Sequence, residues 1–417
     1  MNFLVAIQPP RQHADAGAAR AAVVAGLRLL SVVAGLAYVK YYTNALSVEQ
    51  VGHFFYLGTL SYVLNALVFV PVDSYMQARI ASLEVLPAPP LRRLVLATLA
   101  AGLGASTAIS IPFVALGLLS VGDVPLLYTM AALLYLCASV RNLLNIRGQS
   151  TFAASMVVME SVARLVAFVI AASTIGASAR TLLMSSIAAL AAELVILGWR
   201  ARCTLPLSAV DERLDTPGHI VRTAAMLAGG AASNTVQLQA YRVIFPAAGH
   251  APTAAALGVT ANIGAATMGA CAQVFSQLFL PRLYQSGGAS ISAYVRWGTA
   301  VAVGMLIVGL ALAEFLVRHL TQAAYVPYAP AIGIGIVLEA CNMLIGAYGV
   351  FLTLRGRTGA LFHAQLTGAV LSLTGCLLLL LYLPQSPLML GMVVAGAQLL
   401  VTAALGLYVY RLLQQQA

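Results

Sequence analysis

Charged and polar side chains stand inside apolar segments of this chain, and two patterns among them indicate binding chemistry. In the first apolar segment, Arg28, Ser31, Gly35 and Tyr38 recur at i, i+3, i+7 and i+10, on one face of a helix otherwise made of Val, Leu and Ala. Arg28 has no acid three or four residues away, so we expect it to face the interior. Glu339 stands alone in another apolar segment. A lone buried carboxyl can change its charge with access, which makes Glu339 a candidate for protonation or cation binding.

Other ionisable residues have a structural as well as a functional interpretation. Glu160 and Arg164 lie four apart on one helix face, where an ion pair can form and cancel most of the charge. The pair is therefore expected to be structural and to border the same interior space. Asp73 precedes a basic loop and is interpreted as an end-of-helix residue. Together with Glu339, Glu160 and Asp73 are the candidates for ion coupling.

The composition identifies the elements that must position these residues. The chain is 61% hydrophobic and 8% charged, with a mean hydropathy of +0.92, whereas soluble domains have about a quarter of their residues charged. This is an integral membrane protein. Its net charge of +10 therefore sets topology and does not indicate a nucleic-acid partner. The five cysteines show no paired or metal-ligand spacing, so neither disulfides nor a metal site is expected.

Apolar windows long enough to cross a bilayer, about 20 residues each, predict an all-α protein with twelve spans. The first window is too long for a signal peptide, and a second follows it at once. The predicted spans are 19–42, 50–76, 92–117, 124–146, 152–175, 179–200, 221–246, 253–281, 292–317, 327–352, 359–382 and 387–411.

The arginines gather in alternate loops. Most fall on the side of the N-terminus, which by the positive-inside rule places both termini in the cytoplasm. Arg141, Arg147, Arg355 and Arg357 are interpreted as such anchors. Glu193, near the cytoplasmic end of its span, is expected to pair with Arg200 or Arg202.

Two internal echoes predict a duplicated six-helix unit. "LNIRGQS" at 144–150 returns as "LTLRGRT" at 352–358, and "VGHFFYLG" at 51–58 matches both glycines of "LGVTANIG" at 257–264, at nearly the same offset. Because six is even, the copies insert in the same orientation, as a parallel repeat around a central cavity. The expected organisation is a cytoplasmic lead (1–18), an N-terminal bundle (19–200), a cytoplasmic linker (201–220), a C-terminal bundle (221–412) and a cytoplasmic tail (413–417).

The repeat also pairs the polar stripe of the first span with one in the seventh. Shifting the Arg28 stripe by the offset of the repeat leads to Asn234, Gln237 and Tyr241, which Arg242 follows. The two halves are therefore expected to present matching polar faces to one another.

Several stretches resemble one family of membrane proteins. They are "YYTNALSVEQVGHFFYLGTLSYVLNALVFVPVDSYMQARI" (41–80), "ESVARL" (160–165), "AALGVTANIGAATMGACAQVFSQLFLPRL" (255–283) and "YAPAIGIGIVLEACNMLIGAYGVFLTLRGRTG" (328–359). The first looks like the opening spans of Wzx-type polysaccharide-biosynthesis flippases, O-antigen flippases of the multidrug/oligosaccharidyl-lipid/polysaccharide (MOP) superfamily. The likeness extends over nearly the whole chain, although its motifs are diffuse.

This resemblance implies a MATE-like fold of two six-helix bundles in the bacterial inner membrane, opening alternately to either side. The implied substrate is an undecaprenyl-diphosphate-linked oligosaccharide for O-antigen, capsule or exopolysaccharide assembly, moved without covalent chemistry or a cofactor. Coupling to H+, Na+ or the membrane potential is a candidate, as are a polysaccharide polymerase and a chain-length regulator as partners. A cationic lumen would use Arg28, Arg164 and Arg242, because arginine offers planar, always-charged donors to a diphosphate. The polar walls for the sugars would come from Ser31, Tyr38, Asn234, Gln237 and Tyr241.

Three other classes of membrane protein fit the sequence less well. A MATE-type multidrug exporter would bind organic cations at buried acids and would carry an acid on its first helix, where this chain has Arg28 and no Asp or Glu between Asp15 and Glu49. A membrane enzyme such as an O-antigen polymerase or ligase would need a sizeable outward loop, and the predicted outward loops are short. The major-facilitator fold would need a Gly-x3-Asp-Arg-x-Gly-type loop, which is absent here.

Overall fold

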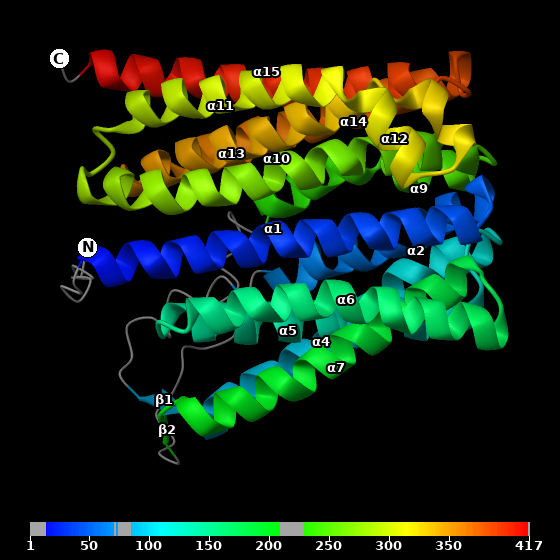
Figure 1. The fold of residues 1–417 in the computed structure, drawn as a ribbon, viewed down its shortest axis with the longest axis horizontal. Helices are drawn as coiled ribbons and strands as arrows, with labels where there is room; N and C mark the ends of the chain where they lie inside the picture. Colours follow the sequence, from blue (N-terminus) through cyan, green and yellow to red (C-terminus); the bar gives the residue numbers. More distant parts are fainter. Residues whose placement is uncertain (1–13, 71, 74–84, 209–228, 416–417) are drawn as a thin grey trace.

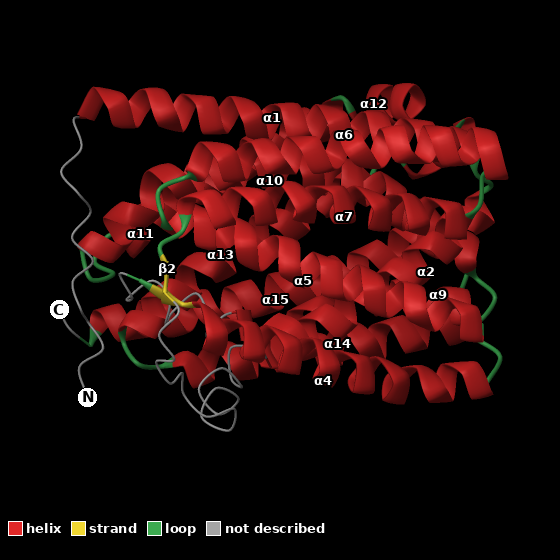
Figure 2. Ribbon diagram, turned by 90° about the horizontal axis from the view of Figure 1, so that it is seen from below, coloured by secondary structure: helices red, strands yellow, loops and turns green. Residues whose placement is uncertain are grey.

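The computed structural model describes residues 14–70, 72–73, 85–208 and 229–415. Long, roughly parallel helices make up nearly all of this part, and the connecting loops gather at the two ends of the molecule (Figures 1 and 2). Two short parallel strands, β1 (Leu86–Pro87) and β2 (Leu207–Ser208), pair at one end. The expected all-α membrane architecture is confirmed.

The helices of the N-terminal half are α1 (Ala14–Ala45), α2 (Val48–Leu64), the π-helical turn η1 (Asn65–Phe69), α4 (Ala88–Ala115), the 3-10 turn η2 (Val121–Asp123), α5 (Val124–Ile146), α6 (Ser150–Ile175) and α7 (Ala179–Thr204). The C-terminal half contains a helical stretch at 229–239, α9 (Tyr241–Ala247), α10 (Ala251–Gln285), α11 (Ile291–Ala311), α12 (Ala313–Leu320), the 3-10 turn η3 (Ala323–Tyr328), α13 (Ala331–Leu354), α14 (Thr358–Tyr382) and α15 (Pro387–Gln414).

Eleven helices of the described part are long and apolar enough to span a membrane. The remaining predicted span, 221–246, begins outside the described residues; its described part is helical at 229–239, turns at Ala240 and continues as α9. α1 begins inside the segment predicted as a lead, and α7 continues to Thr204. Most of the lead (1–18) and of the linker (201–220) lies outside the described residues.

The repeated Arg-Gly phrase forms the same turn in both halves. Gly148 and Gly356 have φ angles of 81° and 67°, the left-handed conformation that favours glycine. In each turn an amide closes back to a buried leucine five residues earlier: Gln149 N to Leu144 O at 2.9 Å, and Arg357 N to Leu352 O at 2.8 Å. This is the hydrogen-bonding pattern of a Schellman helix end, and its duplication supports the parallel repeat.

The two halves meet along α1 and α2, which pack against α9, α10 and α12 (Figure 1). The closest approaches lie at the end of the molecule opposite the termini. A Cβ on Gly52 would stand 2.4 Å from the Ala251 carbonyl oxygen, and one on Gly258 would stand 2.7 Å from the Phe55 ring. Gly52 and Gly258, the first glycine of each copy of the second sequence echo, thus let α2 and α10 cross closely. At the same end, Gln322 Nε2 donates to Leu46 O at 3.2 Å.

Candidate functional site

Arg28, on α1 between the two halves, lines two separate pockets. The N-half pocket, of about 370 Å³, extends from Asn145 and Ser150, at the turn between α5 and α6 on the side of the termini, inward to Arg141 and Glu160. Arg28 closes it from α1. Since one residue borders both pockets, Arg28 can reach a ligand in either half.

The C-half pocket, of about 420 Å³, lies on the other side of α1 among α10, α11 and α13. It extends from Leu280 and Val350, toward the termini, inward to Glu339 and Asn342, with Arg28 on its wall. Arg28 is partly buried, and its Nε atom is fully buried and has no hydrogen-bond partner.

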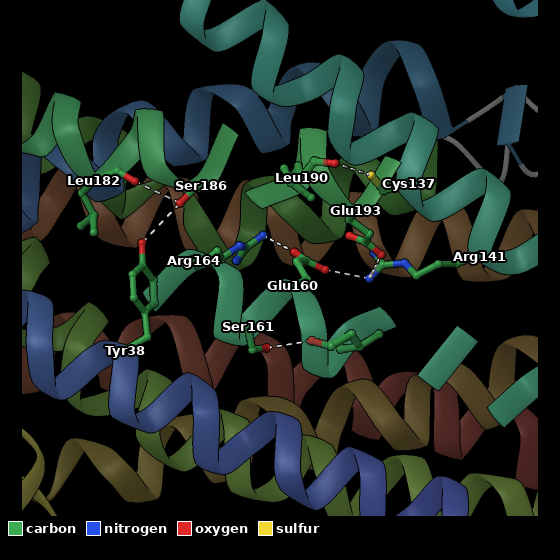
Figure 3. A network of polar contacts seen from close by, with 11 residues as sticks. Tyr38, Cys137, Arg141, Glu160, Ser161, Arg164, Leu182, Ser186, Leu190 and Glu193 are labelled. Carbon is green, nitrogen blue, oxygen red and sulfur yellow. Dashed lines mark hydrogen bonds and ion pairs between the residues drawn. The ribbon is translucent and has the colours of Figure 1, made fainter. Parts of the chain in front are cut away.

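Four charged side chains from three helices form a cluster at the N-half pocket, which we call the charge cluster: Arg141, Glu160, Arg164 and Glu193 (Figure 3). Arg141 Nη1 donates to Glu160 Oε2 at 2.7 Å and lies 3.2 Å from Glu193 Oε1. Arg164 pairs with the other oxygen of Glu160, so the pair expected from the i, i+4 spacing is present.

Two expectations about this region were wrong. Arg141 is not a loop anchor; it lies on α5 and reaches into the charge cluster. Glu193 pairs with Arg141, not with Arg200 or Arg202, while Arg200 Nε donates to Gln149 Oε1 at 2.8 Å. The reason is the rotation of α5 and α7 about their axes, which turns both side chains toward α6.

The charge cluster is neutral by formal count, because its two arginines offset its two glutamates. Arg28 adds one positive charge on the pocket wall. Glu193 is fully buried and neither of its carboxylate oxygens has a hydrogen bond. The N-half pocket therefore carries a net positive charge beside one poorly compensated carboxylate.

A chain of hydrogen-bonded amides, buried at Gln237 and Gln398, leads to the C-half pocket. Asn342 Nδ2 donates to Glu339 Oε2 at 3.2 Å, Gln398 Nε2 donates to Asn342 Oδ1 at 2.8 Å, and Gln237 Nε2 donates to Gln398 Oε1 at 2.6 Å. Gln398 also lies 3.4 Å from Asn234 Oδ1. Glu339 is thus less isolated than its sequence suggests, and the expected polar face of 234–241 points to this chain of amides.

The other polar residues predicted on α1 make local or cross-helix bonds. Ser31 Oγ donates to the Arg28 carbonyl at 2.7 Å on its own helix. The Tyr38 hydroxyl lies 3.3 Å from Ser186 Oγ of α7 (Figure 3). The Tyr38 ring packs edge-on against Phe168. Neither Ser31 nor Tyr38 lines the two pockets described above.

Arg242 is held at the junction of α9, α10 and α2. Its Nε donates to the Tyr241 hydroxyl at 2.9 Å and its Nη2 to Asn262 Oδ1 at 2.8 Å. Its guanidinium stacks 4.7 Å from the centre of the Phe55 ring. The structure therefore brings Arg28 together with Glu160 and Glu339, but places Tyr241 and Arg242 in a separate interhelical contact.

Asp73 accepts hydrogen bonds from Ser139 Oγ at 2.7 Å and Asn142 Nδ2 at 3.4 Å, both on α5. Asn142 in turn lines the N-half pocket. Within the described residues, no group of three or more His, Cys, Asp and Glu side chains is arranged to hold a metal ion.

Sequence reasoning missed Arg141, Asn342 and Gln398 as site residues. Their only signal was a polar side chain inside an apolar window. Spacing along one helix cannot show that Gln398 of α15 meets Asn342 of α13, or that Arg141 of α5 meets Glu193 of α7.

No family model matches this chain, and no curated protein matches it in sequence. Its structure is similar to an inward-facing multidrug resistance MATE family transporter of the MOP superfamily, with a TM-score of 0.60, 13% identity and coverage of 95% of this chain and 100% of that chain. An outward-facing transporter of the same description gives a TM-score of 0.63, 11% identity and 95% coverage of both chains.

A third similar structure is a MOP superfamily transporter from Pyrococcus furiosus, described as having a binding pocket of reverse polarity that suggests a different function. Its TM-score is 0.62, with 11% identity over 93% of this chain and 94% of that chain. This protein is a multi-pass membrane protein with the fold of the MATE transporters of the MOP superfamily.

Proposed function

We propose that the protein moves a lipid-linked oligosaccharide, held on undecaprenyl diphosphate, across the bacterial inner membrane by alternating access, for O-antigen, capsule or exopolysaccharide assembly. The observation that carries this proposal is Arg28: a partly buried arginine at mid-helix that borders both pockets and whose buried Nε lacks a hydrogen-bond partner. An arginine at membrane depth is costly and marks a substrate pathway.

The charge of the N-half pocket suits a diphosphate. Arg28 and Arg141 both line it, and guanidinium groups bind phosphate oxygens through parallel, charge-assisted hydrogen bonds. Arg164 is less available, because Glu160 holds it. We assign the diphosphate to Arg28 and Arg141, in place of the wider cationic lumen of Arg28, Arg164 and Arg242.

The C-half pocket suits the sugars. Its wall combines amides and hydroxyls with aromatic surface: Asn342 and Gln273, and Ser276 with Tyr294, whose hydroxyls lie 2.9 Å apart. A few placed polar groups on an otherwise apolar wall are typical of small-ligand sites. With Arg28 shared between the pockets, one substrate would place its diphosphate on one side of α1 and its first sugars on the other.

The arrangement of the halves supports alternating access. They close on each other at the end opposite the termini, through Gly52 with Ala251 and Gln322 with Leu46, while both pockets extend toward the termini. With cytoplasmic termini, this state would load substrate from the cytoplasm. Glu339, Glu160 and Asp73 remain the coupling candidates for H+, Na+ or the membrane potential, and a polymerase and a chain-length regulator the candidate partners.

A cation-coupled multidrug exporter is the second candidate. Glu339 on the wall of the C-half pocket favours it, as does the name of the MATE transporters with this fold. Arg28 on the same wall disfavours it, because it would repel an organic cation at close range. The Pyrococcus furiosus transporter is likewise described as differing in function through the polarity of its pocket.

The test replaces Arg28 with alanine in protein reconstituted into vesicles. Transport of a fluorescent prenyl-diphosphate oligosaccharide, followed with a membrane-impermeant quencher, should fall at least about tenfold, because one lost charge-assisted contact is worth about 1.5–3 kcal/mol. Arg318→Ala is the matched control, since Arg318 is exposed and paired with Glu314. Full glycolipid transport by Arg28→Ala, or wild-type export of organic cations without glycolipid transport, would refute the proposal.

A further inference from the structure

The charge cluster contains an asymmetry between its two glutamates. Glu160 is held by both Arg141 and Arg164, whereas among the described residues only Arg141 lies within ion-pair distance of Glu193. Glu193 is also the more deeply buried, with no exposed surface and no hydrogen bond to either carboxylate oxygen. If Arg141 moves, Glu160 keeps a partner and Glu193 loses its own.

Arg141 is also the member of the cluster that a diphosphate can recruit. Arg141 lines the N-half pocket beside Arg28, whereas Glu193 contacts Arg141 but does not line the pocket. When a guanidinium turns its N–H groups toward phosphate oxygens, fewer of them remain to bind carboxylates. The phosphate and Glu193 would therefore compete for Arg141.

No second cation of the described residues lies within ion-pair distance of Glu193, but Glu160 lies beside it and could accept a hydrogen bond from its protonated form. α7 packs against α2, α5 and α6. The titratable and charged groups that face the cluster from these helices and from α1 are Tyr62, Cys137, Arg141, Glu160, Arg164 and Tyr38. The Cys137 thiol donates to the Leu190 carbonyl at 3.3 Å. The Glu160 and Glu193 carboxyls lie close enough for a protonated Glu193 to donate to Glu160.

From this geometry we infer that Glu193 is a proton site linked to substrate: a diphosphate that engages Arg141 releases Glu193, which then takes up one proton and donates it in a hydrogen bond to Glu160. The inference rests on the proposed function, since it needs the diphosphate in the N-half pocket. A buried carboxylate without a counter-ion is unstable, and neutralisation by a proton removes that cost.

The charge balance agrees with this step. Arg28, Arg141 and Arg164 against Glu160 and Glu193 give Arg28 and the charge cluster together one net positive charge. Protonation of Glu193 leaves two, which matches a diphosphate diester with one negative charge on each phosphate. Linkage is reciprocal, so protons must also tighten diphosphate binding.

The experiment measures binding of a water-soluble prenyl diphosphate diester of a monosaccharide to the purified full-length protein. This probe does not titrate near neutral pH. Calorimetry in buffers of different ionisation enthalpy should give about one proton taken up per probe bound, and the dissociation constant should fall by up to about tenfold per unit decrease in pH. In wild-type protein, the infrared difference spectrum on binding should gain the band of a protonated carboxyl.

Glu193→Gln should bind the probe with little pH dependence and no proton uptake, and the infrared band should disappear. Glu314→Gln is the matched control, because Glu314 is also paired with an arginine, Arg318, but is exposed; it should behave as wild type. If Glu193→Gln does not fold, the proton uptake and the infrared band of the wild-type protein still decide whether binding is linked to protonation of a carboxyl group. Wild-type binding without proton uptake overturns the linkage and leaves the diphosphate site standing. Failure of the wild-type protein to bind at any pH overturns the diphosphate site, and the linkage with it.

Discussion

Glu339 differs from Glu193 in its neighbours, and this difference separates their roles. Glu339 lines a pocket and accepts a hydrogen bond from the neutral Asn342, which continues through Gln398 to Gln237. No arginine in the described part of the chain lies within ion-pair distance of Glu339, so its charge can be matched by a cation or removed by a proton.

Replacing Glu339 with glutamine should weaken the ion dependence of transport. The amide keeps an oxygen that accepts from Asn342 but cannot carry a charge. Glycolipid transport in vesicles should therefore respond less to an imposed pH or Na+ gradient, whereas the pH dependence of probe binding at the N-half pocket, which belongs to Glu193, should be unchanged. Unaltered gradient dependence in Glu339→Gln would remove this residue from coupling; Glu314→Gln, at an exposed ion pair, provides the comparison.

At the scale of elements, α10 and α13 pack so closely that glycine is required where they cross. A Cβ on Gly335 would stand 1.8 Å from the Ala261 carbonyl oxygen, and one on Gly264 would stand 2.0 Å from the Ile332 carbonyl oxygen. Both obstacles are backbone atoms, which cannot rotate away. This contact sets the depth of Glu339, one turn further along α13.

Gly335→Ala should therefore lower the free energy of unfolding in detergent by about 1–3 kcal/mol, the usual cost of overpacking, and should separate α10 from α13. Gly346→Ala on the same helix, where an added Cβ meets nothing within 4 Å, should be neutral or stabilising, because alanine is the better helix former. Thermal unfolding monitored by size-exclusion chromatography compares the two. Equal stability of the two variants would show that α10 and α13 can move apart to accommodate the added methyl group without a loss of stability.

The elements themselves could be predicted from sequence, because a membrane span must be long, apolar and helical. The Arg-Gly echo also located equivalent turns, because a helix that ends in a Schellman motif favours glycine at the left-handed position, here Gly148 and Gly356. The rotation of each helix could not be predicted. An apolar face suits either lipid or protein in a membrane, so hydropathy did not show that Arg141 turns toward Glu193. Contacts between distant helices, such as Gln237 with Gln398, left no trace in local spacing.

At the scale of the whole molecule, the closed end opposite the termini determines which side the pockets face. The residues that join the halves there come from α2, from α9, from the start of α10 and from the loops beside them. For the pockets to open toward the other side, these contacts must separate. The bond of Gln322 to Leu46 O is one such contact, and it links segments from the two halves.

A reversible cross-link at this end should therefore stop transport without preventing loading. In a Cys203→Ser background, which removes the exposed native thiol, the pair Leu46→Cys and Gln322→Cys is joined by a short thiol-cleavable linker. Transport should fall to background and return on reduction, while the diphosphate probe still binds from the side of the termini.

The control pair Ser120→Cys and Arg180→Cys lies at the same end but within one half, where Arg180 contacts Ser120 and Asp123. That cross-link should leave transport intact, because only separation of the two halves, and no movement within the N-terminal half, is needed for release. Undiminished transport through the cross-linked Leu46–Gln322 pair would show that substrate leaves by another route.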